Sequence, residues 1–220
     1  MAENTVLISF GKVEFSFFQS VAKPVLIEAY SKMGKTVEFI REPGERSLVD
    51  VNTGYADAEL ARVDGLETKY LNFIKVPIPI AYDEVTAYTK QEKFKVEGWH
   101  SLKPYAIEHM LGFKKAEYNT KGMDTEKVTT EKQGLNKVNA GRSDVFIGFR
   151  GTACNIKKLK LPEVIALQPP IEKVLMYHYL NNRHHKMAAE LAVVLRQMKE
   201  SGELELIQNK AKQDFIDHCI

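Results

Sequence analysis

The sequence is poor in the residues that mark several classes of protein. Among its 220 residues it has two cysteines, Cys154 and Cys219, and a single tryptophan. Two cysteines cannot build a disulfide scaffold or a zinc site with cysteine ligands alone. Their wide separation, and the place of Cys219 one residue before the end of the chain, favour two free thiols over a single bridge between them.

A large excess of charge of one sign is also missing. The chain has 31 Lys and Arg against 29 Asp and Glu, which gives a net charge of +2. A dedicated nucleic-acid binder needs a larger or more clustered basic excess, so we expect no nucleic-acid partner. The hydrophobic share of 44% with this low net charge also excludes a disordered chain.

Long apolar runs are absent from the sequence. The stretch from Val76 to Tyr82 is far shorter than the roughly 18–20 residues that cross a bilayer. Residues 1–5 lack the basic segment and the apolar core of a secretory signal. Two expectations follow: the protein is cytoplasmic, or it is a mature form whose signal has been removed.

The familiar catalytic and nucleotide-binding motifs are missing as well. The sequence has no Gly-x-Gly-x-x-Gly, no P-loop, no Gly-x-Ser-x-Gly and no His-Glu-x-x-His. His184 and His185 are adjacent, so on a helix they point in different directions. His100 and His109 have no cysteine or carboxylate at ligand spacing. We therefore expect no metal, no cofactor and no catalytic residues.

Strands and helices alternate along the chain. Residues 5–10, 35–41 and 55–60 have the pattern of strands, and helices between them end at Gly34 and Gly54. Pro24 falls in the first turn of the first helix if Ser20 or Val21 caps it. Two further helices, with apolar stripes from Met187 to Met198 and from Leu204 to Phe215, are separated by Gly202. This alternation predicts an α/β fold with mainly parallel sheets flanked by helices.

One ten-residue pattern occurs twice, in the form Leu-x-x-Val-Asn-x-Gly-x-x-Asp. The first copy runs from Leu48 to Asp57 and the second from Leu135 to Asp144. Leu and Val lie three apart on the buried side of a helix, and Gly supplies its left-handed end. Duplication of a lobe and chance similarity of two helix–Gly–strand units both explain the repeat. Either way, two similar α/β units are predicted.

Two extended segments, residues 73–90 and 173–180, flank the second unit. Pro77 and Pro79 exclude a central strand but suit an edge strand or an extended connection. We expect two lobes joined by two hinge strands, with residues 1–86 and 176–220 in lobe 1 and residues 87–175 in lobe 2. Ligands of such folds bind in the crevice at the carboxyl ends of the strands.

Candidate ligand-binding residues follow from these positions. Arg46 stands at the entrance of a helix and Arg62 just after a strand, and a guanidinium there can bind a carboxylate. The alternative is a surface ion pair, with Glu42 or Asp64 as the partner. In the second unit, the candidates at strand ends are Gly112, Phe113, Lys114, Phe149 and Arg150. Aromatic side chains that could stack on a ligand are Phe10, Phe15, Tyr82 and Trp99.

Several motifs, spread from about residue 5 to residue 210, together resemble a known family. The chain resembles the bacterial extracellular solute-binding proteins of family 3, the amino-acid-type periplasmic binding proteins. The resemblance lies in Pro43-Gly44-x-Arg46-Ser47-Leu48, Gly54-x-x-Asp57-x-Glu59-Leu60-x-Arg62, Val76-Pro77-x-Pro79, Ala140-Gly141-Arg142-x-Asp144 and Leu195-x-x-Met198-x-x-Ser201-Gly202-Glu203-Leu204-x-x-Ile207.

This resemblance implies a type II periplasmic-binding-protein fold that closes around a small ligand. It also implies export to the periplasm, with the signal sequence removed, and an ABC permease or a membrane sensor as partner. Amino-acid binders of the family hold the ligand amine with an acid, and this sequence has Phe149 at the expected place. Their carboxylate-binding arginine stands a little later than Arg62.

We therefore expect a monomeric, non-catalytic protein that binds an amino-acid-like or other carboxylate-bearing ligand for ABC-type uptake or sensing. The rival interpretation is a periplasmic dehydratase-type enzyme on the same fold. It would need a general acid or base, for which Glu14 and Glu59 are the candidates.

Overall fold

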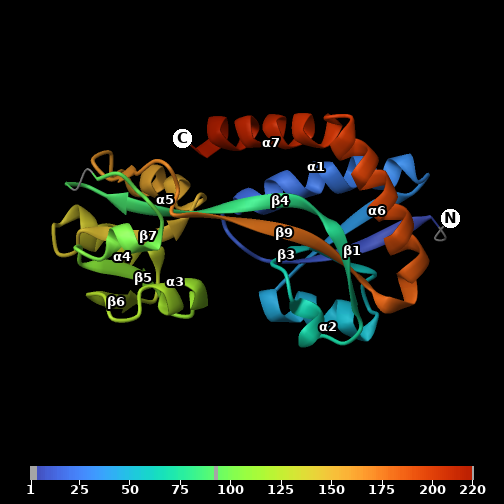
Figure 1. Cartoon of the computed structure of the whole chain (residues 1–220), viewed down its shortest axis with the longest axis horizontal. Coiled ribbons are helices and arrows are strands. Elements are labelled where there is room, and N and C mark those ends of the chain that lie inside the picture. Colours follow the sequence, from blue (N-terminus) through green and yellow to red (C-terminus); the bar gives the residue numbers. More distant parts are fainter. Residues whose placement is uncertain (1–3, 92–93, 220) are drawn as a thin grey trace. The chain divides into compact units, whose positions relative to one another are not determined.

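The computed structural model describes residues 4–91 and 94–219, which form two compact units (Figure 1). Unit 1 comprises residues 4–82 and 175–217, and unit 2 comprises the described residues of 83–174 together with 218–219. The chain passes from one unit to the other within two long strands, β4 (Phe73–Thr89) and β9 (Glu172–Asn181). The expected fold class, an α/β chain of two lobes with two connecting strands, is confirmed. The division differs from the expected one at its first boundary and in the last residues, which belong to unit 2.

The sheet of unit 1 is mainly parallel. Strands β1 (Thr5–Gly11), β2 (Thr36–Glu42) and β3 (Ala58–Arg62) run parallel, and β9 pairs antiparallel with β3. Helices α1 (Phe17–Lys32) and α2 (Gly44–Thr53) cover opposite faces of this sheet (Figure 1). The half of β4 that carries Pro77 and Pro79 lies next to β9 as the last strand of this unit. The 3-10 helix η1 (Leu66–Thr68) lies between β3 and β4.

The first helix begins earlier than the sequence suggested. Its N-cap is Ser16, so Pro24 lies inside the helix and not in its first turn. The cause is the burial of Phe17, which has no exposed surface and packs edge-on against Tyr82 and Phe215. Because of these contacts the helix has an additional turn before the expected apolar stripe. Val21, Val25 and Ala29 of that stripe are fully buried.

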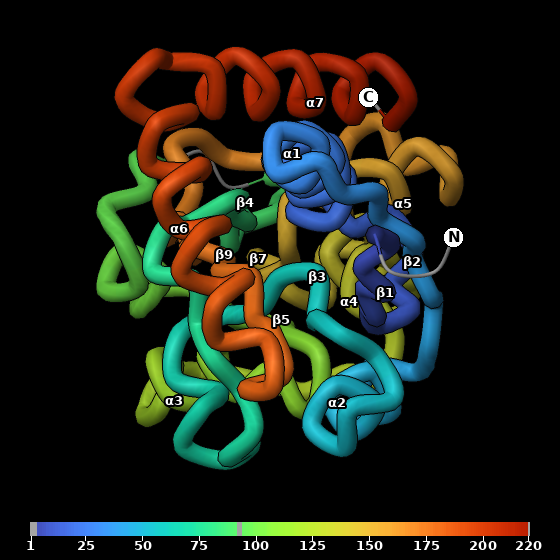
Figure 2. Tube along the Cα trace, turned by 90° about the vertical axis from the view of Figure 1, so that its right-hand side faces the viewer, coloured from blue at the N-terminus to red at the C-terminus, as the bar shows by residue number. Residues whose placement is uncertain are grey.

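The C-terminal part of the chain forms two helices after the 3-10 turn η3 (Asn182–His184). Helix α6 (His185–Glu200) ends before Gly202, whose positive φ of 79° turns the chain into α7 (Glu203–Cys219). Figure 2 shows α7 lying over α1, and the ring centroids of Phe215 and Phe17 are 5.3 Å apart. The apolar stripes of both helices therefore serve packing inside unit 1.

Unit 2 repeats this arrangement with a smaller sheet. Strands β5 (Ile107–Met110), β6 (Thr125–Val128) and β7 (Val145–Phe149) are parallel, and β4 pairs antiparallel with β7 and with β8 (Ile165–Ala166). Helices α4 (Glu131–Asn139) and α5 (Thr152–Leu159) enclose a core around Tyr88, Leu135 and Phe146. The shorter α3 (Lys114–Asn119) follows β5, and η2 (Trp99–Leu102) precedes it.

The two cysteines are joined, and the expectation of two free thiols is wrong. Cys154 in α5 and Cys219 at the end of α7 form a disulfide, with a sequence separation of 65. The expectation rested on the place of Cys219 near the end of the chain, but α7 remains helical as far as Cys219. The helix therefore delivers the last thiol, which is only 7% exposed, to α5.

Both copies of the repeated pattern end a helix in the same way. Gly54 after α2 has φ 82° and Gly141 after α4 has φ 67°, and each N–H donates at 3.1 Å to the carbonyl of the valine three residues earlier. A side chain at either position would be strained, because L-residues rarely adopt this backbone conformation. The glycine of the pattern therefore performs one structural task in both units.

Candidate functional site

Arg62 is held in one orientation at the carboxyl-end edge of the parallel strands of unit 1. Its Nε donates to Glu59 Oε1 at 2.9 Å, and its Nη2 donates to the Gly44 carbonyl at 3.2 Å and to Ser47 Oγ at 3.0 Å. Nη1 has no hydrogen-bond partner within the described part of the chain, and the side chain is 24% exposed. The guanidinium is thus held in place by three acceptors, none of which uses the two N–H groups of Nη1.

Gly11 at the end of β1 allows this arrangement. A Cβ at this position would lie 3.0 Å from Gly44 Cα and 3.1 Å from Arg62 Nη2. Contacts this short are tighter than ordinary van der Waals contact, so the neighbouring atoms would have to move by a few tenths of an ångström, and the first of them belongs to the backbone. Glycine at position 11 therefore favours the close approach of the end of β1, the start of α2 and the guanidinium.

Glu59 is the buried anion of this cluster. Its side chain is about 1% exposed, and burial raises its pKa to about 7, although the charge of Arg62 and contacts with Ser47 and Arg62 act in the opposite direction. Near neutral pH the carboxyl is therefore divided between its two forms. Arg62 offers a net positive charge whenever Glu59 is protonated.

The corresponding region of unit 2 holds a second buried ion pair. Arg150, just after β7, donates from Nη1 to Glu84 Oε2, and the Glu84 side chain is 5% exposed. The neighbouring Asp83 accepts a hydrogen bond of 2.8 Å from the Glu84 N–H. Burial raises the pKa of Asp83 to about 7, against the stabilising contacts of its carboxylate with the N–H groups of Glu84 and Arg150. Two acids and one arginine thus gather within unit 2.

The aromatic residues expected in unit 2 come together at the ends of β5 and β7. The rings of Phe113 and Phe149 are 4.6 Å apart, and the Tyr88 hydroxyl donates to the Phe149 carbonyl at 2.8 Å. Phe149 stands where amino-acid binders were expected to carry an acid. The Phe113–Phe149 pair places two aromatic rings at this position instead.

Gly112 and Lys114 are less available to an anion than expected. The Gly112 N–H donates to Glu117 Oε1 at 3.1 Å, and Lys114 Nζ lies 2.8 Å from Glu117 Oε2. The hydrogen bonds from Lys114 and from the Gly112 N–H lower the pKa of the Glu117 carboxyl to about 2. The helix that follows has only six residues. The role of Gly112 and Lys114 in ligand binding stays a prediction.

The remaining predicted residues lie elsewhere. Arg46 forms an ion pair of 2.7 Å with Asp50, not with Glu42 or Asp64, and its side chain is 62% exposed. Tyr82 packs against Phe17, and Trp99 Nε1 donates to Glu172 at 2.9 Å. Phe10 and Phe15 line a separate pocket of unit 1.

Sequence reasoning missed Glu131 at the start of α4. Its carboxylate accepts hydrogen bonds from Thr152 Oγ1 at 3.0 Å and from Asn155 Nδ2 at 2.6 Å, which joins α4 to α5. The signal was available, because Thr130 and Gln133 form a capping box that marks this helix start. Glu84 was missed because a lone acid inside a strand has no recognisable spacing.

Residues 4–91 and 94–219 contain neither a metal-binding cluster nor a membrane-spanning helix. No cluster of histidine, cysteine and acidic side chains suitable for a metal ion lies among them. None of the helices formed by these residues is both long enough and apolar enough to cross a membrane.

Sequence comparison gives one distant relative, and no family model matches the chain. An uncharacterized protein of Shewanella oneidensis is 25% identical over 214 residues, which cover 93% of this chain and 80% of the relative.

Structural comparison is more informative. The probable amino-acid ABC transporter extracellular-binding protein ytmK of Bacillus subtilis matches with a TM-score of 0.75 at 12% identity, over 94% of this chain and 97% of its own. A histidine kinase sensor domain with similarity to periplasmic binding proteins matches with a TM-score of 0.67 at 15% identity, over 94% and 95% of the two chains. An ancestral cationic amino acid solute binding protein gives the same values. The chain therefore has the fold of the family 3, amino-acid-type solute-binding proteins, a fold that sensor domains share.

Proposed function

We propose that this protein is an extracytoplasmic solute-binding protein for a small ligand that carries a carboxylate. The observation that carries the proposal is the orientation of Arg62, whose guanidinium is fixed by three acceptors while Nη1 remains available. A guanidinium fixed before binding loses little side-chain freedom when the ligand arrives.

The fold and the disulfide support this role. Solved structures with the same fold are described as a probable amino-acid ABC transporter extracellular-binding protein, an ancestral cationic amino acid solute binding protein and a histidine kinase sensor domain. The Cys154–Cys219 disulfide suits an oxidising compartment such as the periplasm. An ABC permease or a membrane sensor is the proposed partner, and the monomer is the proposed state.

The proposed contact of Arg62 with a ligand carboxylate is not the bidentate one that pairs two guanidinium nitrogens with two carboxylate oxygens. Nε and Nη2, the side of the guanidinium that normally pairs with a carboxylate, are occupied by Glu59, Gly44 and Ser47. A ligand carboxylate is left with the two N–H groups of Nη1. The proposed ligand is an amino-acid-like or other organic anion.

A thermal-shift screen of small metabolites tests the proposal. A ligand present at a hundred times its Kd stabilises the folded state by about 2.7 kcal/mol, which raises the melting temperature measurably. The screen should compare each carboxylate with its amide. Stabilisation by amides equal to that by the carboxylates would count against a contact with Arg62.

The raised pKa of Glu59 supports a second candidate function, that of an enzyme. Its pKa of about 7 suits a general acid or base near neutral pH, as a dehydratase on this fold would require. Each compound that stabilises the protein should therefore be incubated with it and analysed by mass spectrometry. Conversion that disappears in Glu59→Gln would establish the enzyme, and an unchanged ligand would support the binding protein.

A further inference from the structure

A pocket of about 300 Å³ lies in unit 1 where α1 begins beside the ends of β1 and β2. Its walls include the aromatic rings of Phe10, Phe15 and Phe215, and Lys23 and Arg41 supply positive charge. None of the described residues that line it is acidic. Its volume is at the lower end of the range for small-molecule sites.

This pocket and Arg62 lie on opposite faces of the same sheet. Consecutive residues of a strand point to opposite sides, and Phe10 and Gly11 are consecutive in β1. Phe10 lines the pocket on the side of α1, whereas Gly11 approaches Gly44 of α2 and the guanidinium of Arg62. The pocket is thus a different place from the site of the proposed function.

The two cations of the pocket are neighbours. The strand register pairs Phe10 with Arg41, and the Lys23 ammonium lies 3.9 Å from the centre of the Phe10 ring. Burial, and then the charge of Arg41, lower the pKa of Lys23. Within residues 4–91 and 94–219, no carboxylate forms an ion pair with either cation. Two like charges without a counter-ion are unfavourable, and an anion between them would remove that cost.

Two further features face the same space. The Oγ of Ser16 is buried and has no hydrogen-bond partner among the described residues, although Ser16 is the N-cap of α1. Phe15 beside it has φ 53°, which is uncommon for a residue other than glycine. The start of a helix of 16 residues adds partial positive charge. The Ser16 hydroxyl, the start of α1 and the positive φ of Phe15 thus lie next to the aromatic walls of the pocket.

We propose that this pocket is a second, separate binding site, which takes a small carboxylate with an aromatic or other apolar body. Lys23 and Arg41 bind the carboxylate, Ser16 Oγ donates a hydrogen bond to it, and the rings of Phe10, Phe15 and Phe215 contact the apolar part. The site does not depend on the proposed function, because it uses none of the residues around Arg62.

Benzoate, benzyl alcohol and benzylamine are matched probes of this site, since they share a ring and differ in charge. Calorimetry should give saturable millimolar binding of benzoate only, with an affinity that falls as salt is added. Arg41→Gln and Lys23→Gln should each weaken benzoate binding about tenfold. The control Lys35→Gln removes the same charge from the same unit outside the pocket and should leave the affinity unchanged.

Backbone NMR spectra locate the bound probe. Benzoate should shift the amide signals of residues 10–23, and urea melts of each variant identify any loss that comes from unfolding. Arg41 is exposed, so Arg41→Gln tests the site even if Lys23→Gln is unstable. Absence of benzoate binding, equal binding of benzyl alcohol, or shifts at residues 44–47 instead would overturn the proposal. The last result would leave the proposed function intact.

Discussion

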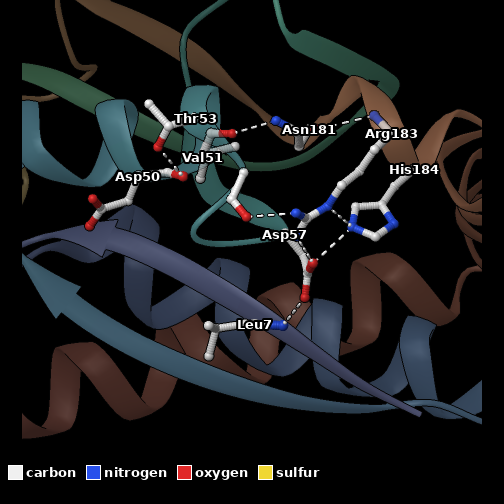
Figure 3. A network of polar contacts seen from close by, with 9 residues as sticks. Leu7, Asp50, Val51, Thr53, Asp57, Asn181, Arg183 and His184 are labelled. Atoms are coloured by element: carbon white, nitrogen blue, oxygen red, sulfur yellow. Dashed lines mark hydrogen bonds and ion pairs between the residues drawn. The ribbon is translucent and has the colours of Figure 1, made fainter. Parts of the chain in front are cut away.

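The Asp57 carboxylate accepts a hydrogen bond of 2.8 Å from the Leu7 N–H (Figure 3), and the Asp57 N–H donates to the Leu7 carbonyl at 2.9 Å. Asp144 makes the same two bonds with Ala106, at 2.8 and 2.9 Å. In both units, the aspartate that ends the repeated pattern thus joins two neighbouring parallel strands. Asp57 joins the start of β3 to β1, and Asp144 joins the start of β7 to the start of β5. The recurrence of the aspartate follows from this shared task.

Replacing either aspartate should destabilise the protein. Asp144→Ala leaves the Ala106 N–H without its acceptor, which should cost about 1–3 kcal/mol of unfolding free energy in urea melts. Asp57→Ala should cost more, because Arg183 and His184 also bind the Asp57 carboxylate. Asp124→Ala is the control, since Asp124 is exposed on the surface of unit 2. Equal losses in Asp124→Ala and Asp144→Ala would contradict the structural role.

The sequence predicted the fold because the fold depends on local patterns. The strand at residues 5–10, the helix that ends at Gly54 and the two tail helices all appear close to their expected places. Each follows from alternation, helical periodicity or a glycine at a helix end. The error at Pro24 has the opposite cause, since Phe17 is buried by residues distant in sequence, Tyr82 and Phe215.

The candidate site was less predictable for the same reason. Arg62 could be found from its position after a strand, but its partners Gly44 and Ser47 come from another element. The Glu84–Arg150 pair joins residues 66 positions apart, and the disulfide joins residues 65 apart. Such pairings need the folded chain, because a single sequence without an alignment contains no record of contact between distant residues.

The disulfide predicts a specific labelling result. Unfolded in urea without a reductant, the protein should not react with iodoacetamide, and after reduction it should gain two labels in mass spectra. Urea is required because Cys154 and Cys219 are 4% and 7% exposed, so burial alone would protect free thiols. Cys154→Ser/Cys219→Ser should lose about 2–4 kcal/mol of stability. Labelling of the unreduced protein would disprove the bridge.

His178 should make the protein sensitive to acid. It is fully buried in unit 1, where its ring nitrogens contact the Tyr30 hydroxyl and the Leu60 carbonyl, each at 3.0 Å. Burial lowers its pKa to about 4. Because the unfolded histidine binds a proton more readily, stability is complete above about pH 6.5 and falls towards pH 4, by up to roughly 3 kcal/mol. Urea melts of His178→Gln should show a shallower acid slope, and an unchanged slope would contradict this assignment.

Arg62 variants test both binding and stability. Once a ligand is known, Arg62→Ala should weaken its binding by about 1.5–3 kcal/mol, and Arg62→Lys should restore only part, since an ammonium cannot keep the contacts to Glu59, Gly44 and Ser47 together. Arg62→Ala should also lower stability at pH 8, where Glu59 is ionised and would lose its cation. The control Arg196→Ala removes an exposed arginine of α6. Equal loss of ligand affinity in that control would remove Arg62 from the site.

Glu59 gives the opposite pH dependence to His178. Burial raises its pKa from 4.5 to about 7, so the folded state binds the proton more tightly than the unfolded state between these values. Its contribution to stability is therefore complete below about pH 4.5 and is lost as the pH rises to 7, by up to roughly 3 kcal/mol. Asp83 adds a similar loss in unit 2, so the wild-type slope alone does not identify Glu59.

The comparison that isolates Glu59 is the difference between wild type and Glu59→Gln in urea melts from pH 4.5 to 8. Glutamine keeps an acceptor for Arg62 Nε but cannot ionise, so this variant should gain stability relative to the wild type as the pH rises. Asp83→Asn should likewise gain stability relative to the wild type as the pH rises. The effects of the two substitutions should add because the residues lie in different units. The same protonation should favour an anionic ligand at Arg62, so that wild-type affinity rises about threefold to tenfold from pH 8 to pH 6. Because Glu59→Gln already lacks the negative charge, its affinity should be high and constant over this range. A wild-type affinity that is independent of pH would show that Glu59 does not regulate the charge of Arg62.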